Sequence, residues 1–440
     1  MHGKIIYNCA LTDVQSFSIQ HSIQDYELYK TMNFASLDLS PNLLKAIDAC
    51  GYTTMTPIQE QAIIPARRGK DLLAIAQTGT GKTAAFSLPI LQQVIDERTN
   101  AKEQQGPHNP VALILTPTRE LAEQLAQTIS EYAQFLELKI TATFGGGKVS
   151  AQANKLNQGV DILIATPGRL IEHIEQCNVD LASVKYAVLD EADRMLDMGF
   201  INDVQNLLRY THKNRQTLLF SATLSPAVNE LSHRILKNHQ EIRATRVNTT
   251  AETVTHMAYP VEERRKIDLF MDLLAQYNWF QVLVFTSTTH QADKLFKRLR
   301  EQKIDADVCH GDKRQNARRR ALKNFKEAKI QVLIATEVAA RGLDIQGLDF
   351  VVNYNLPFLA EDYVHRVGRT GRAGQTGTAI SFVSREEERS LDAIQRLIGS
   401  KIKRVHVPGF EVSDRDSLIN KVSKERRKNR LNKSSQTKIK

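Results

Sequence analysis

The chain has 440 residues, of which 42% are apolar and 25% charged, the proportions of an ordinary globular protein. No apolar run approaches the ~20 residues of a membrane-spanning helix, and the N-terminus lacks the pattern of a secretory signal. The four cysteines lie far apart with no CxxC pair, which argues against a disulfide framework or a zinc site. We therefore expect a cytoplasmic protein of two or three domains with no membrane contact.

The formal net charge of +10 is concentrated at the C-terminal end. Positions 421–440 hold nine Lys/Arg and one acidic residue, Glu425, a net charge of +8, which leaves +2 for the rest of the chain. A basic segment with few apolar residues is predicted to be disordered. It is either a salt-sensitive phosphate binder or a solubilising end.

The N-terminal part of the chain changes character at Met32. Residues 1–31 show no clear periodicity and are predicted to be a disordered extension, or to precede a natural start at Met32. From 32 to 60 the pattern is regular, since Ser40-Pro41 caps a helix with apolar residues at helical spacing and Gly51 ends it.

A glycine-bearing turn separates an apolar strand, Leu72–Ile75, from a helix, Ala84–Ile95. Its backbone N–H groups can cradle phosphate, Lys82 can bind the outer phosphates, and the Thr83 hydroxyl can reach a phosphate-bound Mg²⁺. Since the strict pattern has glycine at the first position, the alternative is an ordinary Gly-rich surface turn. The turn comprises Ala76, Gln77, Thr78, Gly79, Thr80, Gly81, Lys82 and Thr83.

Apolar strands then alternate with helices, which predicts an α/β domain over 61–243 with a parallel sheet covered on both faces. Functional loops are expected at the carboxyl ends of its strands. Residues 96–110 are predicted to form a surface loop. The predicted strands are 111–116, 161–166, 186–190 and 216–221, and the predicted helices are 119–135 and 168–176.

A polar, Thr-rich stretch at 244–258 is predicted to be a linker. A second strand–helix series follows over 259–412 and has no phosphate turn of its own. Its predicted strands are 282–285, 332–335 and 350–353, and the basic tail occupies 413–440. Two α/β domains on one linker imply a cleft between them.

Four residues, Asp190-Glu191-Ala192-Asp193, end an apolar strand about one hundred residues after the phosphate turn. Asp190 suits a Mg²⁺ site, and Glu191 is placed to orient or deprotonate an attacking water. Alone, such a tetrapeptide would be a charged loop, but its position at a strand end favours function.

The segment His365-Arg366-Val367-Gly368-Arg369-Thr370-Gly371-Arg372 spaces arginines three residues apart. These arginines form either a solvated face or a source of positive charge for a γ-phosphate in the transition state. Offered by the second domain across a cleft, they would make hydrolysis depend on domain closure.

With these motifs in this order, the chain resembles the DEAD-box RNA helicases over roughly residues 32–410, and most closely the bacterial RhlE-type members. The resemblance implies an α/β fold of two tandem RecA-like domains. It also implies that ATP binding and hydrolysis, with Mg²⁺, are coupled to local unwinding of short RNA duplexes or remodelling of RNA–protein complexes.

The resemblance implies roles for individual residues. Gln59 would hydrogen-bond adenine, Phe34 would pack on it, and Asp344 would bind the ribose. The catalytic set would be Lys82, Glu191, Arg369 and Arg372. The residues that couple ATP state to unwinding would be Ser221, Thr223, His365 and Arg366, the last two through contacts with the first domain.

The family's RNA-contacting motifs supply N–H groups, hydroxyls and arginines, which suit phosphate and sugar oxygens. We therefore expect sequence-independent RNA binding in which the 2′-OH distinguishes RNA from DNA. These residues are Pro117, Thr118, Arg119, Gly145, Gly146, Thr166, Pro167, Gly168, Arg169, Thr286, Gln315, Arg318 and Thr336. Glu337 stands where the family usually has Asp, which leaves local interdomain contacts in doubt.

Two other functions remain open at this point. A DNA helicase or translocase would share the phosphate turn and acidic residues, although the Q motif around Gln59 and the arginine segment fit the RNA family. An ATP-gated RNA clamp would do without hydrolysis, but Lys82, Glu191 and Arg372 are all retained. The sequence does not name the RNA, so ribosome-assembly complexes, RNA-decay complexes and cold adaptation all stay open.

Overall fold

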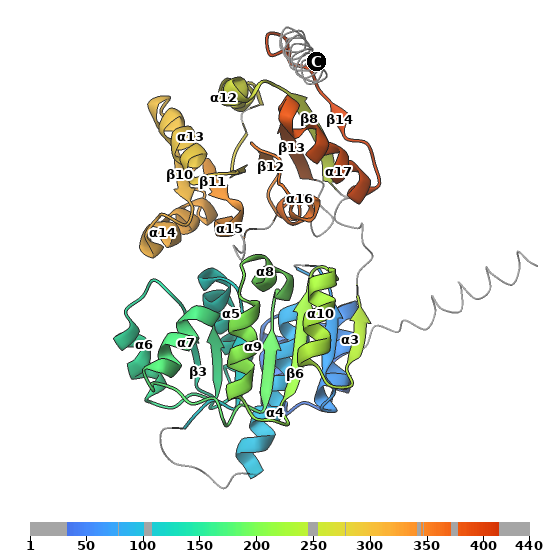
Figure 1. Ribbon diagram of the computed structural model, residues 1–440, viewed down its shortest axis with the longest axis vertical. Coiled ribbons are helices and arrows are strands. Elements are labelled where there is room, and N and C mark those ends of the chain that lie inside the picture. Colours follow the sequence, from blue (N-terminus) through green and yellow to red (C-terminus); the bar gives the residue numbers. More distant parts are fainter. Residues whose placement is uncertain are drawn as a thin grey trace, which may run out of the picture. The chain divides into compact units, whose positions relative to one another are not determined.

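Apolar strands that alternate with helices build two α/β units, each around its own sheet. The computed structural model describes residues 33–77, 79–100, 108–244, 254–277, 279–340, 345, 347–370 and 377–412. The chain divides into two compact units at positions 245 and 246. Figure 1 colours the first from blue to green and the second from yellow to red. The predicted extension at 1–31 and the tail at 413–440 lie outside the described residues.

The first unit has a seven-stranded parallel sheet in the order β3-β4-β2-β5-β6-β1-β7. The register aligns the carboxyl ends of its strands, since Leu115 lies opposite both Ala165 and Leu189, and Ile75 lies opposite Ser221. The loops that follow these strands therefore gather at one edge. The strands are β1 (Leu72–Ile75), β2 (Ala112–Leu115), β3 (Ile140–Thr143), β4 (Ile162–Ala165), β5 (Tyr186–Leu189), β6 (Gln216–Ser221) and β7 (Gln240–Arg243).

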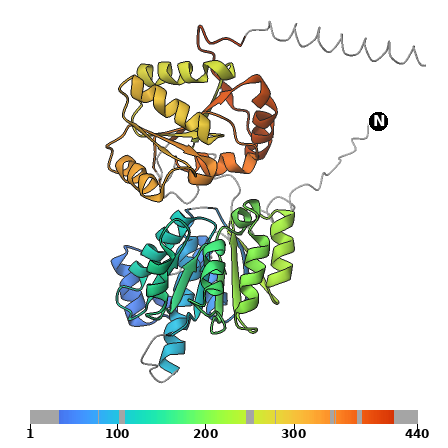
Figure 2. The same ribbon diagram turned by 60° about the vertical axis from the view of Figure 1, so that its left-hand side comes forward.

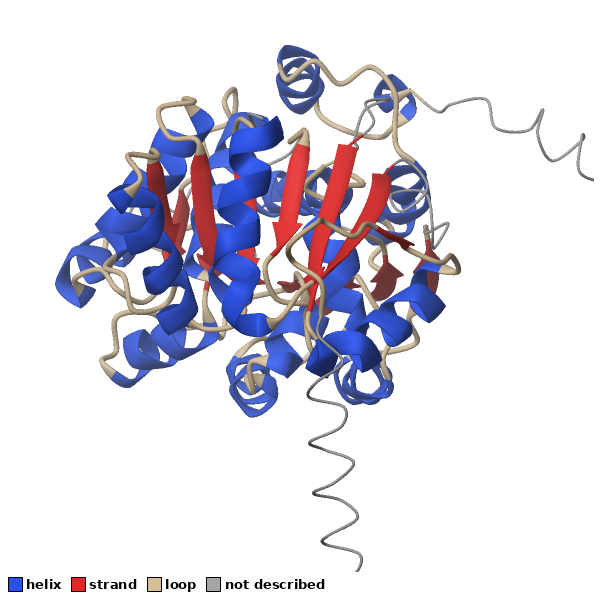
Figure 3. Cartoon of the chain, turned by 90° about the horizontal axis from the view of Figure 1, so that it is seen from above, coloured by secondary structure: helices blue, strands red, loops and turns tan. Residues whose placement is uncertain are grey.

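Helices cover both faces of this sheet because successive strand residues point to opposite faces (Figure 3). Leu72 and Ala74 pack with α2, α3, α4 and α5, whereas Leu73 and Ile75 pack with α7, α8, α9 and α10. The helices are η1 (Phe34–Ser36), α2 (Pro41–Ala49), α3 (Pro57–Arg67), α4 (Lys82–Asn100), α5 (Arg119–Tyr132), α6 (Val149–Leu156), α7 (Pro167–Glu175), α8 (Ala192–Asp197), α9 (Ile201–Tyr210) and α10 (Pro226–Ile235).

The second unit repeats this architecture with a parallel sheet in the order β10-β11-β9-β12-β13-β8-β14. Its strands are β8 (Val254–Pro260), β9 (Val282–Thr286), β10 (Ala306–Cys309), β11 (Val332–Thr336), β12 (Phe350–Asn353), β13 (Gly377–Val383) and β14 (Lys403–Arg404).

Helices again cover both faces, as Figure 2 shows. Val282 and Val284 pack with α12 and α13, and Leu283 packs on the other face with α14 and α15. Ala379 of β13 packs with α16 and α17. The helices are η2 (Glu263–Arg265), α12 (Lys266–Tyr277), α13 (Thr289–Glu301), α14 (Gln315–Lys326), α15 (Glu337–Ala340), α16 (Ala360–Val367), η3 (Arg385–Glu387) and α17 (Glu388–Ile398).

The predicted fold class is confirmed, and strands 72–75, 216–221 and 350–353 have the predicted bounds. Two segments differ. The last five residues of the predicted linker, 254–258, begin β8, where Val254 and Ala258 are buried and Thr255 is exposed. Residues 96–100 of the predicted surface loop belong to α4, because these five residues include no glycine or proline that would end the helix.

The core of the first unit gives a stability prediction. Phe220 is fully buried, and its ring meets that of Phe86 edge-on with centroids 5.3 Å apart. Phe220→Ala should lower the free energy of unfolding of this unit by about 3–5 kcal/mol, measured by urea titration and circular dichroism. The control is Phe135→Ala, whose ring is 37% exposed and should contribute less than about 1 kcal/mol. Equal losses in the two variants would contradict this core.

Candidate nucleotide and RNA site

The phosphate turn joins β1 to the first residue of α4, Lys82. The side chain of Lys82 is 7% exposed, and its Nζ has no hydrogen-bond partner among the described residues. Gly79 and Gly81 have φ of +84° and +92°, which only glycine adopts without strain. The Thr80 hydroxyl donates to the Gln77 carbonyl at 2.8 Å. A buried ammonium at the N-terminus of a long helix suits an anionic ligand.

The predicted nucleotide site also includes Ala76, Thr78, Thr83 and Asp344. Ala76 is buried, and Thr83 follows Lys82 in the first turn of α4. Thr78 and Asp344 lie outside the described residues. The structure therefore gathers the predicted phosphate-binding residues that it describes into one strand–turn–helix segment.

Gln59 of α3 contacts the phosphate turn directly. Its Oε1 accepts the Thr56 N–H at 2.9 Å, and its Nε2 donates to the Gly81 carbonyl at 3.2 Å. A Cβ on Gly81 would lie 2.5 Å from that Nε2, so the approach requires glycine. Phe34 is buried in the core of the first unit, where its ring stacks on Tyr52. The adenine contacts of Gln59 and Phe34 stay predictions.

The acidic residues Asp190 and Glu191 follow β5 at the same edge of the sheet. Burial raises the pKa of the Asp190 carboxyl, and the Lys82 ammonium lowers it. Glu191 has φ 55° and ψ 53°, a left-handed conformation that costs a non-glycine residue about 1–3 kcal/mol. Its Oε2 is buried and has no hydrogen-bond partner among the described residues. Such unrelieved strain at a buried carboxylate points to a functional position.

Asp193, the last acidic residue of the four, is joined to the end of β6. Its Oδ2 accepts the Thr223 N–H at 3.0 Å and the Thr223 hydroxyl at 3.1 Å. The Ser221 hydroxyl donates to the Thr223 carbonyl at 2.7 Å. Ala192, which lies between Glu191 and Asp193 in the sequence, is also buried. Of the predicted coupling residues, Thr223 is therefore bonded to Asp193, 30 residues away in the sequence, and Ser221 is bonded to Thr223.

The predicted RNA-contacting residues of the first unit converge on the Gly145–Gly147 turn. A Cβ on Gly146 would lie 2.2 Å from Nη1 of Arg119, so the guanidinium lies directly on that turn. Arg169 Nη1 donates to the Gly147 carbonyl at 3.1 Å. Thr118 caps α5 and Thr166 precedes α7, and Pro117, Pro167 and Gly168 adjoin them. Two helix starts and two arginines thus surround one glycine turn at the carboxyl edge of the sheet.

In the second unit, Thr286 and Thr336 end neighbouring strands and lie opposite each other in the register. Gln315 is the first residue of α14, and Arg318 is buried one turn later. Arg369 follows α16 and is also buried. His365 Nδ1 lies 4.0 Å from an Asp362 carboxylate oxygen, and Arg372 lies outside the described residues.

Arg366 has an internal role that the sequence analysis missed. Its guanidinium is ion-paired with Glu337, donates to Asn353 Oδ1 at 3.1 Å and to the Asn355 carbonyl at 2.8 Å, and lies over the Phe285 ring. Glu337, which we associated with interdomain contacts, therefore pairs within its own unit. The opposite charges were visible in the sequence, but nothing in their 29-residue separation indicated contact.

A fully buried lysine supports the same network. Lys266 Nζ lies 2.6 Å from Glu387 and 2.7 Å from Glu263. Glu263 accepts the Asn355 side-chain amide at 3.2 Å, and Glu387 accepts the Leu356 N–H at 3.0 Å. Because the Asn355 carbonyl also accepts a hydrogen bond from Arg366, Lys266 helps to fix the arginine-bearing helix α16.

Breaking the Arg366 pair gives a second prediction. Glu337→Ala would leave a buried guanidinium without its carboxylate, so the free energy of unfolding of the second unit should fall by about 3 kcal/mol. The fluorescence of Trp279, which lies in this unit, reports the urea transition. Glu361→Ala removes an exposed carboxylate from α16 and should change stability by less than about 0.5 kcal/mol. A Glu337→Ala loss no greater than that of Glu361→Ala would refute the buried pair.

The oxygen atoms near the phosphate turn could serve as ligands for a divalent cation. Among the described residues, no three His, Cys, Asp or Glu side chains gather as a metal cage. Mg²⁺ in nucleotide sites keeps several waters and needs only one or two carboxylates plus phosphate oxygens. The buried carboxyl of Asp190 and the hydroxyl of Thr83 meet that lesser requirement.

In the described part of the chain, no helix combines the length and apolarity needed to cross a bilayer.

Comparison with known proteins matches both units. The DEAD/DEAH box helicase family model matches residues 56–231, and the helicase conserved C-terminal domain matches 265–374. The DEAD-box ATP-dependent RNA helicase RhpA of Helicobacter pylori is 38% identical over 384 residues, 87% of this chain and 76% of that protein. CshA of Bacillus subtilis is 38% identical over 381 residues, 87% and 75% of the two chains.

Solved structures agree with this assignment. S. cerevisiae Dbp5 bound to RNA and ADP BeF3 aligns with a TM-score of 0.75 and 32% identity, over 89% of this chain and 99% of that one. Mss116p bound to ssRNA and AMP-PNP aligns with a TM-score of 0.75 and 28% identity, over 88% and 81%. The chain belongs to the DEAD-box ATP-dependent RNA helicases.

Proposed function

We propose that this chain hydrolyses ATP when RNA is bound and uses that cycle to separate short RNA duplexes or to remodel RNA–protein complexes. One observation carries the proposal most directly. The buried ammonium of Lys82 has no hydrogen-bond partner among the described residues and shares an edge of the sheet with Asp190, Glu191 and the Arg119–Gly146 turn. A phosphate site and an RNA site at one edge can influence each other.

In the proposed reaction, the N–H groups of the phosphate turn and Lys82 hold the outer phosphates of ATP. Glu191 orients a water for attack on the γ-phosphorus and takes its proton, while the bond to the leaving β-phosphate oxygen breaks. Asp190 and Thr83 would hold Mg²⁺, which neutralises phosphate charge. Gln59 and Phe34 are proposed to select adenine, and Asp344 to bind the ribose.

RNA is proposed to lie along the carboxyl edges of both sheets. Arg119, Arg169 and the N–H groups of the helix starts would contact its phosphates, and hydroxyls such as Thr286 and Thr336 would contact sugar oxygens. Arg369 and Arg372 are proposed to reach the γ-phosphate when the two domains close. Ser221, Thr223 and His365 would transmit ATP state to the RNA, because Thr223 is bonded to Asp193.

Finer assignments belong to the same proposal. We further propose that the chain belongs to the RhlE-type branch, on its motif set, and the phylogeny of residues 56–374 tests this. Grouping with CshA-type sequences would reject it. The dispersed cysteines support a cytoplasmic location, and ribosome-assembly or RNA-decay complexes are the proposed partners.

The role of Glu191 gives a third prediction. Glu191→Gln preserves size and nucleotide binding but removes the base, so RNA-stimulated turnover should fall by about 10²–10⁴-fold. Steady-state phosphate release measures turnover, and a fluorescent ATP analogue measures binding. Glu175→Gln, an exposed change on α7, is the matched control and should leave both unchanged. Wild-type-like turnover in Glu191→Gln would reject this role.

Nucleic-acid specificity gives a fourth prediction. The ATPase rate should rise with single-stranded RNA and stay near its basal value with DNA of the same sequence and length, because sugar contacts recognise the 2′-OH. Equal stimulation by the two would favour a DNA helicase or translocase instead.

A further inference from the structure

A cavity of about 700 Å³ opens in the first unit, within the 300–1,000 Å³ range of small-molecule sites. It is lined by residues that precede β1, β5 and β6, and by the C-terminal parts of α3 and α4. Because the strands are parallel, their amino ends lie at the edge opposite to the phosphate turn. The cavity is therefore distinct from the site described above.

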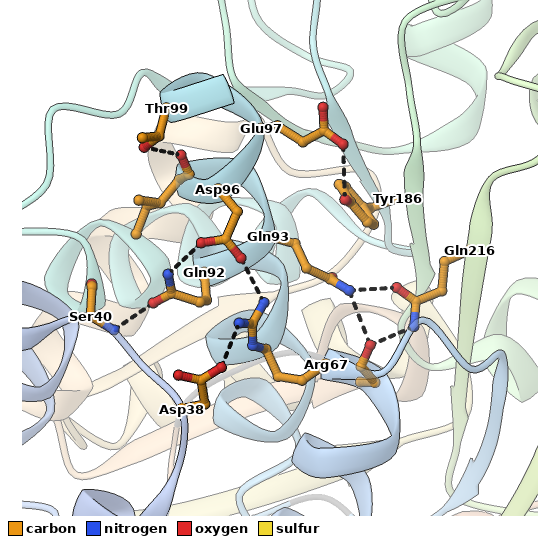
Figure 4. Close-up of polar contacts among 12 residues, drawn as sticks. Asp38, Ser40, Arg67, Gln92, Gln93, Asp96, Glu97, Thr99, Tyr186 and Gln216 are labelled. Atoms are coloured by element: carbon orange, nitrogen blue, oxygen red, sulfur yellow. Dashed lines mark hydrogen bonds and ion pairs between the residues drawn. The ribbon is translucent and has the colours of Figure 1, made fainter. Parts of the chain in front are cut away.

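The floor of the cavity is polar and buried. Gln93 of α4 and Gln216 of β6 are each 7% exposed, and Gln93 Nε2 donates to Gln216 Oε1 and to the Ala66 carbonyl, both at 3.0 Å (Figure 4). Gln216 Nε2 donates to the carbonyls of Ala66 and Lys70. Gln93 Oε1 has no hydrogen-bond partner among the described residues. The floor is therefore uncharged, and its two amide side chains are hydrogen-bonded to each other and to backbone carbonyls.

The carboxylates that line the cavity are already engaged. Asp96 pairs with Arg67 at 2.9 Å, as Figure 4 shows, and Glu97 pairs with Lys185 at 2.6 Å. Asp71 is buried and accepts the backbone N–H groups of Thr217 and Lys237. These contacts leave little negative charge to repel an anion.

Two of the cations that line the cavity, Arg68 and Arg215, form no ion pair with a carboxylate among the described residues. Arg68 is exposed and has no ion pair within the described part of the chain. Arg215 donates from Nη1 to the Leu208 carbonyl, but its buried Nε has no partner among the described residues, and the Nε of Arg67 is likewise unpartnered. Burial lowers the pKa of Arg215, which an anionic ligand would oppose. With five Lys/Arg against three Asp/Glu, the lining carries a net charge of +2.

We propose that this cavity binds a small anion that carries a phosphate or carboxylate group. The anionic oxygens accept from the guanidinium groups of Arg215 and Arg68. A cavity of this volume suits a small molecule better than a nucleic-acid strand.

Calorimetric titration of the full chain tests this proposal, with saturating ADP present to fill the phosphate turn. Ribose 5-phosphate and citrate are the probes, which distinguish a phosphate from a carboxylate ligand, and ribose is the uncharged control. At least one anion should bind with a Kd of about 1 mM, as expected for so few atoms, and ribose should not bind.

Variants locate the binding. Arg215→Gln should weaken it about tenfold, and Arg68→Gln, whose exposed side chain is not needed for folding, should also weaken it. Arg209→Gln, an exposed change outside the cavity, is the matched control and should bind as the wild type does.

Two results overturn the proposal: neither anion binds, or Arg68→Gln and Arg215→Gln bind the anion as tightly as Arg209→Gln does. A loss of RNA affinity in Arg215→Gln with unchanged anion binding would also overturn it and identify an RNA surface instead. RNA-stimulated ATPase activity in the absence of added anion should be equal in all three variants.

Discussion

The ammonium of Lys82, buried without a hydrogen-bond partner among the described residues, is the constraint on which the nucleotide site depends. An unsatisfied buried charge destabilises the unliganded protein, and phosphate oxygens would remove that penalty. At the same edge of the sheet, burial raises the pKa of the Asp190 carboxyl, and Glu191 has a strained left-handed backbone. We therefore expect the phosphates of ATP to gain most binding free energy from Lys82, whose buried ammonium has no partner among the described residues.

In the second unit, by contrast, the buried guanidinium of Arg366 is ion-paired with Glu337 and hydrogen-bonded to Asn353 and Asn355. Lys266 holds the same loop through Glu263 and Glu387. These contacts fix α16 before any ligand binds. The first unit therefore has unsatisfied buried groups where nucleotide would bind, whereas in the second unit the buried Arg366 of α16 is already paired.

The sequence predicted the central strands because parallel strands buried on both faces are continuous apolar runs, such as Leu72–Ile75. It missed the edge strands β3, β7, β10 and β14, whose sequences are polar or mixed. It also missed β8, most of which was predicted as linker, and β13, where Gly, Thr and Ser interrupt the apolar pattern. Motif order predicted the residues of the site but not their contacts. Gln59 on Gly81, Arg119 on Gly146 and Glu337 on Arg366 join positions at least 22 residues apart, which only the sheet register and helix packing bring together.

The central claim is that ATP bound at this edge drives the separation of RNA strands. A strand-displacement assay on a short RNA duplex with a single-stranded overhang tests it most directly, with ATP and with a non-hydrolysable analogue compared at saturation. The account predicts repeated displacement by ATP with a small excess of duplex over protein, and at most one displacement per protein with the analogue. Equal multiple-turnover displacement with the analogue, or none with ATP despite active hydrolysis, would contradict it.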